Sequence, residues 1–229
     1  MGTGTRPGLI RAAAEVFADR GFRAATIREI CRRAGANVAS VKYHFGDKGR
    51  LYAAVLEELA AEQVAVARLE ARLLRGEERL REFVGVFLRR VLADGPMALH
   101  GKIMAREMVE PTAALDHVVA GFIRPEAEAL GVAVREIVGD GVPEDELRLL
   151  CMSVVGQVVF YKHCRPVVER LFPDFRCDAR LVQRLTDHIT GFSVAALRRI
   201  REERRRSGSA KASRRATPAV RPAPRRRVR

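Results

Sequence analysis

The sequence predicts an all-α protein in which an N-terminal three-helix unit with a helix-turn-helix is joined by one long helix to a helical bundle. Three observations lead to this class. Apolar residues recur at helical spacing along most of the 229 residues, without the alternation that marks strands. Two short helices with a glycine turn between them are expected from Thr26 to Lys48. Residues 51–74, rich in Ala, Leu and Glu, contain neither Gly nor Pro, which favours one unbroken helix.

The first helix is expected to begin near Pro7, because the fixed φ of proline suits the first turn of a helix. It should end at Gly21, with Phe22 folding back as the apolar partner of the glycine stop. One stripe of this helix is apolar and is expected to pack across the helix-turn-helix. The stripe consists of Leu9, Ile10, Ala13, Val16 and Phe17.

The second helix is expected to begin at Ile27. Thr26 and Glu29 match a capping box, in which a hydroxyl and a carboxylate each satisfy a backbone N–H at the start of a helix. Gly35 follows after about two turns, and glycine commonly ends helices. We therefore predict a short helix that ends in a tight turn.

The third helix is expected to run from Asn37, a second N-cap candidate, to Phe45, where Gly46-Asp47 stops it. At about 100° per residue Val38, Val41 and Phe45 share one face, which should pack against the neighbouring helices. The opposite face is small, polar and aromatic, which suits contact with base edges and phosphates in a major groove. It consists of Ala39, Ser40, Tyr43 and His44, with Lys42 on its flank.

The segment Leu9–Tyr52 resembles the DNA-binding domain of the TetR family of bacterial transcriptional repressors. The likeness is clearest in the run AGANVASVKYHFGDK at residues 34–48 and in Leu51-Tyr52. The family usually has an aromatic residue where Lys42 stands. The resemblance implies binding to double-stranded operator DNA through eight residues. These are Thr26 and Arg28 on the second helix, Asn37, Ser40, Lys42, Tyr43 and His44 on the third, and Lys48 as a phosphate contact.

The formal net charge of +14 is concentrated at the two ends of the chain. Residues 1–50 contain 10 Lys and Arg against 4 Asp and Glu, residues 51–200 contain 20 against 22, and residues 201–229 contain 12 against 2. A basic first segment agrees with phosphate binding. The tail 205–229 has almost no large apolar residue, so we expect it to be disordered, either holding DNA loosely through its charge or only aiding solubility.

Neither a catalytic set nor a metal or cofactor site is expected. The five histidines are scattered without metal-ligand spacing, and the chain has no G-x-G-x-x-G and no P-loop. Glu107 and Glu110 lie one turn apart, but Glu110 precedes Pro111 at a helix end, so a solvated or capping role is expected rather than a carboxylate dyad. The four cysteines are expected to be buried free thiols, with a redox pair as the alternative. They are Cys31, Cys151, Cys164 and Cys177.

A cytoplasmic protein without membrane segments is expected. The N-terminus lacks the apolar core of a signal peptide. The longest uncharged run covers 13 residues from Leu149 to Tyr161. A run of that length is too short to cross a hydrocarbon core of about 30 Å.

Beyond Gly76 five further helices are expected, over residues 77–93, 100–109, 114–138, 143–171 and 179–204. Turns are predicted at Asp94-Gly95-Pro96, Glu110-Pro111-Thr112, Gly139-Asp140-Gly141 and Phe172-Pro173-Asp174. Pro125 and Pro166 should kink or split two of the helices. The predicted domains are thus a DNA-binding unit at 1–50, an effector-binding and dimerising bundle at 51–204, and the tail at 205–229.

The bundle region is similar to a TetR subgroup whose regulatory domain carries R-E-x-x-E-P-T, I-R-P and G-Q-x-x-x-Y followed by R-P. In this sequence these motifs are Arg106–Thr112, Ile123–Pro125, Gly156–Tyr161 and Arg165-Pro166. Some members of that subgroup are linked to control of membrane transport and drug sensitivity.

A small-molecule effector is expected to bind inside the bundle. Gln157 lies in an apolar run and must find hydrogen-bond partners, which either another helix or a ligand supplies. Methionine and aromatic side chains on neighbouring helices offer adaptable apolar surface, with core packing as the alternative for each. The predicted cavity would suit an uncharged or mostly apolar effector. Its expected lining is Met104, Met108, Phe122, Gln157 and Tyr161.

Two copies of the chain are expected to associate through the last two helices in an isologous four-helix interface. The apolar stripes nominated for it include Val155, Val159, Leu181, Leu185, Ile189, Phe192 and Leu197. The predicted function is a homodimeric, ligand-responsive repressor that binds a palindromic operator. The alternatives are a DNA-compacting protein without sequence specificity, suggested by the charge, and a helical enzyme that processes small molecules.

Overall fold

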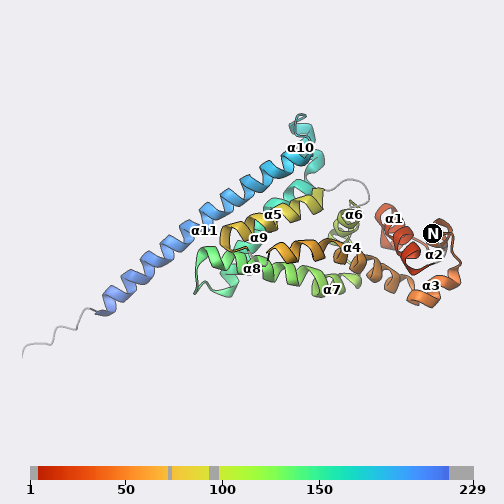
Figure 1. The fold of residues 1–229 in the computed structure, drawn as a ribbon, viewed down its shortest axis with the longest axis horizontal. Coiled ribbons are helices and arrows are strands. Elements are labelled where there is room, and N and C mark those ends of the chain that lie inside the picture. Colours follow the sequence, from red (N-terminus) through yellow and green to blue (C-terminus); the bar gives the residue numbers. More distant parts are fainter. Residues whose placement is uncertain (1–4, 72–73, 93–97, 217–229) are drawn as a thin grey trace, which may run out of the picture.

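The computed structural model describes residues 5–71, 74–92 and 98–216, and every regular element within these ranges is helical (Figure 1). The predicted all-α class is therefore confirmed. The elements are α1 Arg6–Ala24, α2 Ile27–Ala34, α3 Val38–Phe45, α4 Lys48–Ala71, α5 Gly76–Leu92, α6 Ala98–Val109, α7 Ala114–Val118, the π-helical turn η2 Val119–Ile123, α8 Arg124–Val138, α9 Glu144–His163, α10 Arg165–Leu171 and α11 Ala179–Ala216.

The helix-turn-helix forms where its capping residues predict it. Thr26 Oγ1 accepts a hydrogen bond of 3.2 Å from the backbone N–H of Glu29, and Asn37 Oδ1 accepts one of 3.0 Å from Ala39. Gly35 ends α2 in the left-handed region, with φ of 62°. The Glu29 carboxylate pairs with Arg20 of α1 at 3.3 Å, so it also ties α2 to the preceding helix.

Both prolines split the helices that contain them. The predicted helix 114–138 consists of α7, η2 and α8, with the π-helical turn directly before Pro125. The predicted helix 143–171 is broken at Cys164, and α10 begins one residue before Pro166. Since proline has no N–H to donate and its ring clashes with the preceding turn, the regular α hydrogen-bond pattern is interrupted at both points. Before Pro125 the dihedral angles stay in the α region, whereas Cys164 leaves it, with φ of −93° and ψ of 5°.

Helix α11 extends to Ala216, well past its expected end at Arg204. The expectation of disorder is therefore wrong for residues 205–216, because a helix that is already packed can propagate through Arg, Ala and Lys without burying more surface. The end of α11 points away from α1–α3 (Figure 1). The rest of the tail, 217–229, and the predicted turn at 94–96 lie outside the described residues.

Two apolar clusters form the core. The first holds residues of α1, α2, α3 and the start of α4, and it also takes Ile103 of α6, Val118 of α7 and Phe122 of η2. The second lies between α5, α8, α9 and α11. The predicted domain boundary near residue 50 therefore falls inside the first cluster, and the helix-turn-helix is packed on part of the bundle.

The second cluster corrects the stripes nominated for dimerisation. Four of the nominated side chains are buried within the protomer, where they face α5, α8 and α9. Val155 packs partly against the same cluster, and Val159 is half-buried. The buried four are Leu181, Leu185, Ile189 and Leu197. Phe192, by contrast, is exposed. Helical periodicity identifies an apolar stripe but does not say whether its own chain or a second copy covers it.

Candidate nucleic-acid interface

Helix α3 presents a polar and aromatic face to solvent. Tyr43 is 85% exposed, and its ring meets that of His44 edge to face at 5.0 Å. Val41 and Phe45 are buried against the neighbouring helices. Val38 is 48% exposed, so the expectation that it packs inward is wrong. As the first residue of a short helix it adds apolar surface to the outer face, of the kind that can contact a thymine methyl group.

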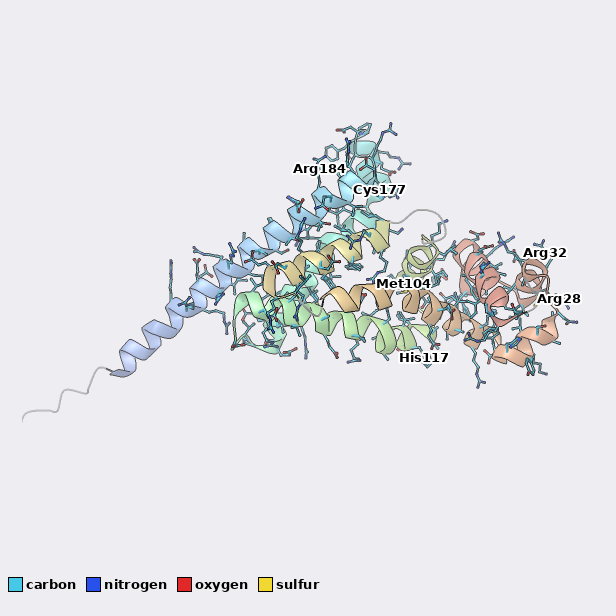
Figure 2. The ribbon with its side chains drawn as sticks, viewed as in Figure 1. Arg28, Arg32, Met104, His117, Cys177 and Arg184 are labelled. Carbon is cyan, nitrogen blue, oxygen red and sulfur yellow. The ribbon has the colours of Figure 1, made fainter. Side chains whose placement is uncertain are left out.

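The predicted contact residues of α2 and α3 lie together at one end of the molecule. Thr26, Arg28, Asn37, Lys42, Tyr43 and His44 are exposed, and Ser40 is half-buried. Arg32, at the end of α2, is also exposed and lies near Arg28 (Figure 2). Sequence reasoning did not select Arg32, although the Arg-Arg pair at 32–33 was a signal. Its neighbour Arg33 instead pairs with Glu15 of α1 at 2.8 Å.

Lys48 joins the end of α1 to the start of α4. Its Nζ donates hydrogen bonds to the carbonyl oxygens of Arg23 at 3.2 Å and Ala25 at 2.9 Å, and it lies 4.6 Å from the centre of the Phe22 ring. Two of the three N–H donors of the Lys48 ammonium group are therefore used in hydrogen bonds within the protein. The predicted phosphate contact of Lys48 stays a prediction, to be made by the remaining donor.

A buried carboxylate connects α4 to α6. Glu107 is only 2% exposed, and it accepts hydrogen bonds from the Tyr52 hydroxyl at 2.7 Å, from the backbone N–H of Thr112 at 3.0 Å and from the Thr112 hydroxyl at 3.1 Å. Glu107 is thus buried and hydrogen-bonded, whereas Glu110, for which the sequence predicts a solvated or capping role, is exposed. Burial, and then the hydrogen bond to Glu107, raise the pKa of Tyr52 far above its usual value, so this phenol stays a donor.

The residue before Glu107 holds α1. Arg106 donates from Nε to the carbonyl of Ala18 at 3.3 Å and from Nη2 to that of Asp19 at 2.9 Å, near the kink at Gly21. Gly21 has φ of 77°, and a Cβ there would lie 3.2 Å from Arg106 Nη1. Consecutive residues of α6 therefore grip α1 and α4. We call Tyr52, Arg106, Glu107 and Thr112 the α6 latch.

The structure does not bring the five predicted ligand residues together. Phe122 belongs to the first cluster and Met104 packs partly against it, whereas Met108 is 52% exposed. Gln157 Nε2 donates to the Ser193 hydroxyl of α11 at 3.1 Å, and the Tyr161 ring stacks on Phe175 with centres 5.9 Å apart. The expected convergence is wrong: α6 and α9 both contact α5, but Met104 and Phe122 lie at the first apolar cluster and Tyr161 at the second. Another helix thus supplies a partner for Gln157.

All four cysteines are free thiols. Only Cys31 is buried, and the other three are half-buried, which corrects the expectation that all are buried. Burial raises the pKa of Cys31 and of Cys151 above the usual thiol value, which lowers their thiolate fraction and their reactivity.

Within 5–71, 74–92 and 98–216, no three His, Cys, Asp or Glu side chains are grouped as metal ligands. In the same ranges no helix combines the length and the apolar composition that a bilayer crossing requires.

Two family models match the chain. The model of bacterial regulatory proteins of the TetR family matches residues 9–55. The model of the C-terminal domain of the HTH-type transcriptional dual regulator CecR matches residues 76–197, which is more than half of the chain.

Individual relatives agree with these matches. The dual regulator CecR of Shigella flexneri is 28% identical over 165 residues, which cover 67% of this chain and 74% of that regulator. The HTH-type transcriptional repressor NicS of Pseudomonas putida is 37% identical over 81 residues, or 35% of this chain, and the chain spans only 38% of that repressor.

Solved structures share the fold. HlyIIR, a hemolysin II transcriptional regulator, aligns with a TM-score of 0.58 at 22% identity, over 81% of this chain and 96% of that one. The transcriptional regulator FadR from Bacillus subtilis, in complex with stearoyl-CoA, aligns with a TM-score of 0.64 at 14% identity, over 83% and 98%. At these identities the alignments establish the fold alone.

Removal of the Tyr52 hydroxyl from the α6 latch should lower the stability of the protein. Tyr52→Phe leaves the buried Glu107 carboxylate without one of its donors, so the free energy of unfolding should fall by about 1–3 kcal/mol in urea denaturation. Tyr161→Phe is the matched control, because the described residues offer its hydroxyl no hydrogen bond, and it should stay within about 0.5 kcal/mol of the parent. Equal stabilities for the two variants would contradict the latch.

Proposed function

This chain belongs to the TetR family of bacterial transcriptional regulators, and on that premise we propose that it is a repressor, released from a palindromic operator by a small-molecule effector. The observation that carries the proposal is the exposed face of α3, where Tyr43 and His44 point outward beside Lys42. Hydroxyl, imidazole and ammonium groups on a short helix suit both base edges and phosphates in a major groove. The basic end formed by α2 supplies Arg28 and Arg32 for the flanking backbone.

The proposed assembly is a homodimer through α9 and α11. Four of the large apolar side chains that the protomer leaves exposed lie on these two helices. They are Leu149, Met152 and Phe160 on α9 and Phe192 on α11. Gly156 and Gly191, on the same helices, have open space where a Cβ would stand, so a partner helix can approach closely. An exposed apolar patch rimmed by polar residues is typical of such an interface.

The two-fold symmetry of the dimer would determine the arrangement of half-sites in its operator. Helix-turn-helix dimers place their recognition helices about 34–36 Å apart, one turn of B-DNA, and so read inverted half-sites. Two protomers joined at α9 and α11 leave their α1–α3 units free at the outer ends, as the position of these helices in Figure 1 suggests. A palindromic operator follows from this symmetry.

The α6 latch offers a route from effector to DNA. Helix α6 contacts α5 of the bundle on one side and α1 and α4 on the other. An effector that favours a shifted α6 would move α1 and α4 through Arg106 and Glu107, and with them the spacing of the recognition helices. The stearoyl-CoA bound by FadR supports the idea that this fold admits a small-molecule effector.

The principal rival is binding of DNA without sequence specificity. The charge of +14 motivates it. The basic C-terminal end of α11 points away from α1–α3 (Figure 1). This direction argues against a tail that binds the same stretch of DNA as the helix-turn-helix. Sequence preference separates the two functions.

Base readout by α3 predicts selective loss of operator binding. Tyr43→Ala and His44→Ala should each weaken binding to an operator, selected from random-sequence DNA, by about 5-fold to 150-fold, the range of one lost base contact. Binding to non-specific DNA should change little. His117→Ala is the control, since His117 is exposed on α7, outside both the α3 face and the proposed α9–α11 interface, and it should leave both affinities unchanged. Equal loss on both DNAs for the α3 variants would favour the compaction function.

If α9 and α11 form the dimer interface, a charged residue placed there should leave the protein monomeric. Phe192→Glu buries a carboxylate in the proposed contact, so analytical ultracentrifugation should find half the mass of the parent at micromolar concentration. Val109→Glu, at an exposed apolar residue on α6, should stay dimeric. A parent that is already monomeric, or a dimeric Phe192→Glu, would rule out this interface.

A further inference from the structure

An ion pair lies inside the bundle between α5 and α8. Arg90, only 8% exposed, holds Glu126 with both ends of its guanidinium: Nη2 donates to Oε2 at 2.8 Å, and Nη1 donates to Oε1. The rings of Phe87 and Phe122 each lie 4.8 Å from Arg90 Cζ. The guanidinium is therefore held by two aromatic rings while its fork engages one carboxylate.

The ion pair of Arg90 and Glu126 is expected to contribute little to the free energy of unfolding. A buried ion pair loses hydration that its attraction barely returns, and apolar residues of similar size often serve a core as well. It is, however, a well-formed carboxylate receptor, because the guanidinium fork matches the two oxygens of a carboxylate and the rings fix its plane. At present the carboxylate in the receptor comes from the chain itself.

Glu126 is placed so that it can leave. Its side chain is 25% exposed, against 8% for Arg90, and it lies in the first turn of α8. Directly before that turn is η2, the π-helical segment Val119–Ile123, and π-helical turns often occur at functional sites. A rotation of the Glu126 side chain toward solvent would open the Arg90 fork without unpacking α5.

Apolar surface adjoins the receptor. Phe122, which lies against Arg90, belongs to the first cluster, and Met104 of α6 packs partly against that cluster. A ligand whose carboxylate meets Arg90 would thus lay its body beside an aromatic ring and toward the helix that bears the latch. Acidic compounds with an apolar body combine both properties.

We propose that Arg90 anchors the carboxylate of an acidic effector with an apolar body, and that Glu126 occupies the fork when the effector is absent. This deepens the function proposed above and replaces the uncharged effector expected from sequence. Entry of the ligand frees Glu126 and the first turn of α8 from α5. Since η2 contacts α4, the change reaches the helix that carries Tyr52 of the latch.

The test measures thermal stability of the full chain without DNA, so it does not depend on the proposed operator binding. The probes are decanoic acid and phenylacetic acid, each beside its primary amide. In the parent protein the acids should raise the melting temperature more than the amides. In Glu126→Gln the internal competitor is gone, so the acid concentration for half-maximal shift should fall at least about tenfold.

Two further variants make the result specific. Glu136→Gln is the matched control, because Glu136 pairs with Arg79 across the same two helices at 3.6 Å, and it should leave the acid response unchanged. The double variant Arg90→Met with Glu126→Met keeps apolar bulk without a lone buried charge, and it should lose the preference for acids over amides.

The outcomes separate cleanly. An acid preference in Glu126→Gln that the double variant abolishes supports the proposal, whether or not the parent responds. The proposal is overturned if neither the parent nor Glu126→Gln prefers acids, if the double variant keeps the preference, or if Glu136→Gln gains the same affinity. Operator binding of the parent without any acid, measured separately, tests the proposed function by itself.

Discussion

The rest of the structure depends on the hydrogen bonds around the Glu107 carboxylate. A buried carboxylate is costly unless every accepting position is used, and here Tyr52 and Thr112 supply the donors. The bond from Tyr52 fixes the start of α4, and the bonds from Thr112 order the turn that leads into α7. Together with the hydrogen bonds that Arg106 of α6 donates to α1, they hold the helix-turn-helix against the bundle. The orientation of α3 therefore depends on the whole protomer.

This constraint explains why two functions can share one chain. The exposed face of α3 lies at one end, and the ion pair of Arg90 and Glu126 lies in the bundle, with α4, α6 and η2 between them. The first apolar cluster crosses from the DNA-binding unit into α6, α7 and η2. A shift of these elements therefore cannot leave α1 and α4 unchanged, because close-packed interiors respond by moving as units.

Local signals predicted local structure well. Thr26, Asn37 and Gly35 act within a few residues of themselves, and the two prolines split their helices for the same local reason. Pairings across the fold were out of reach, since no pattern in the sequence joins Arg90 to Glu126, 36 residues later, or Gln157 to Ser193. Burial of Leu185 within the protomer, and the extension of α11, were missed because periodicity and composition do not reveal what an element packs against.

The most direct measurement is hydrogen–deuterium exchange of the free protein, comparing Glu107→Ala with Glu110→Ala, an exposed position one residue past the end of α6. Glu107→Ala should speed exchange of backbone amides in α1, α2 and α3 while α5, α8 and α11 keep their protection. Glu110→Ala should match the parent throughout. Unchanged protection of α1–α3 in Glu107→Ala, or an equal loss in every helix, would contradict the claim that Glu107 positions the recognition helix.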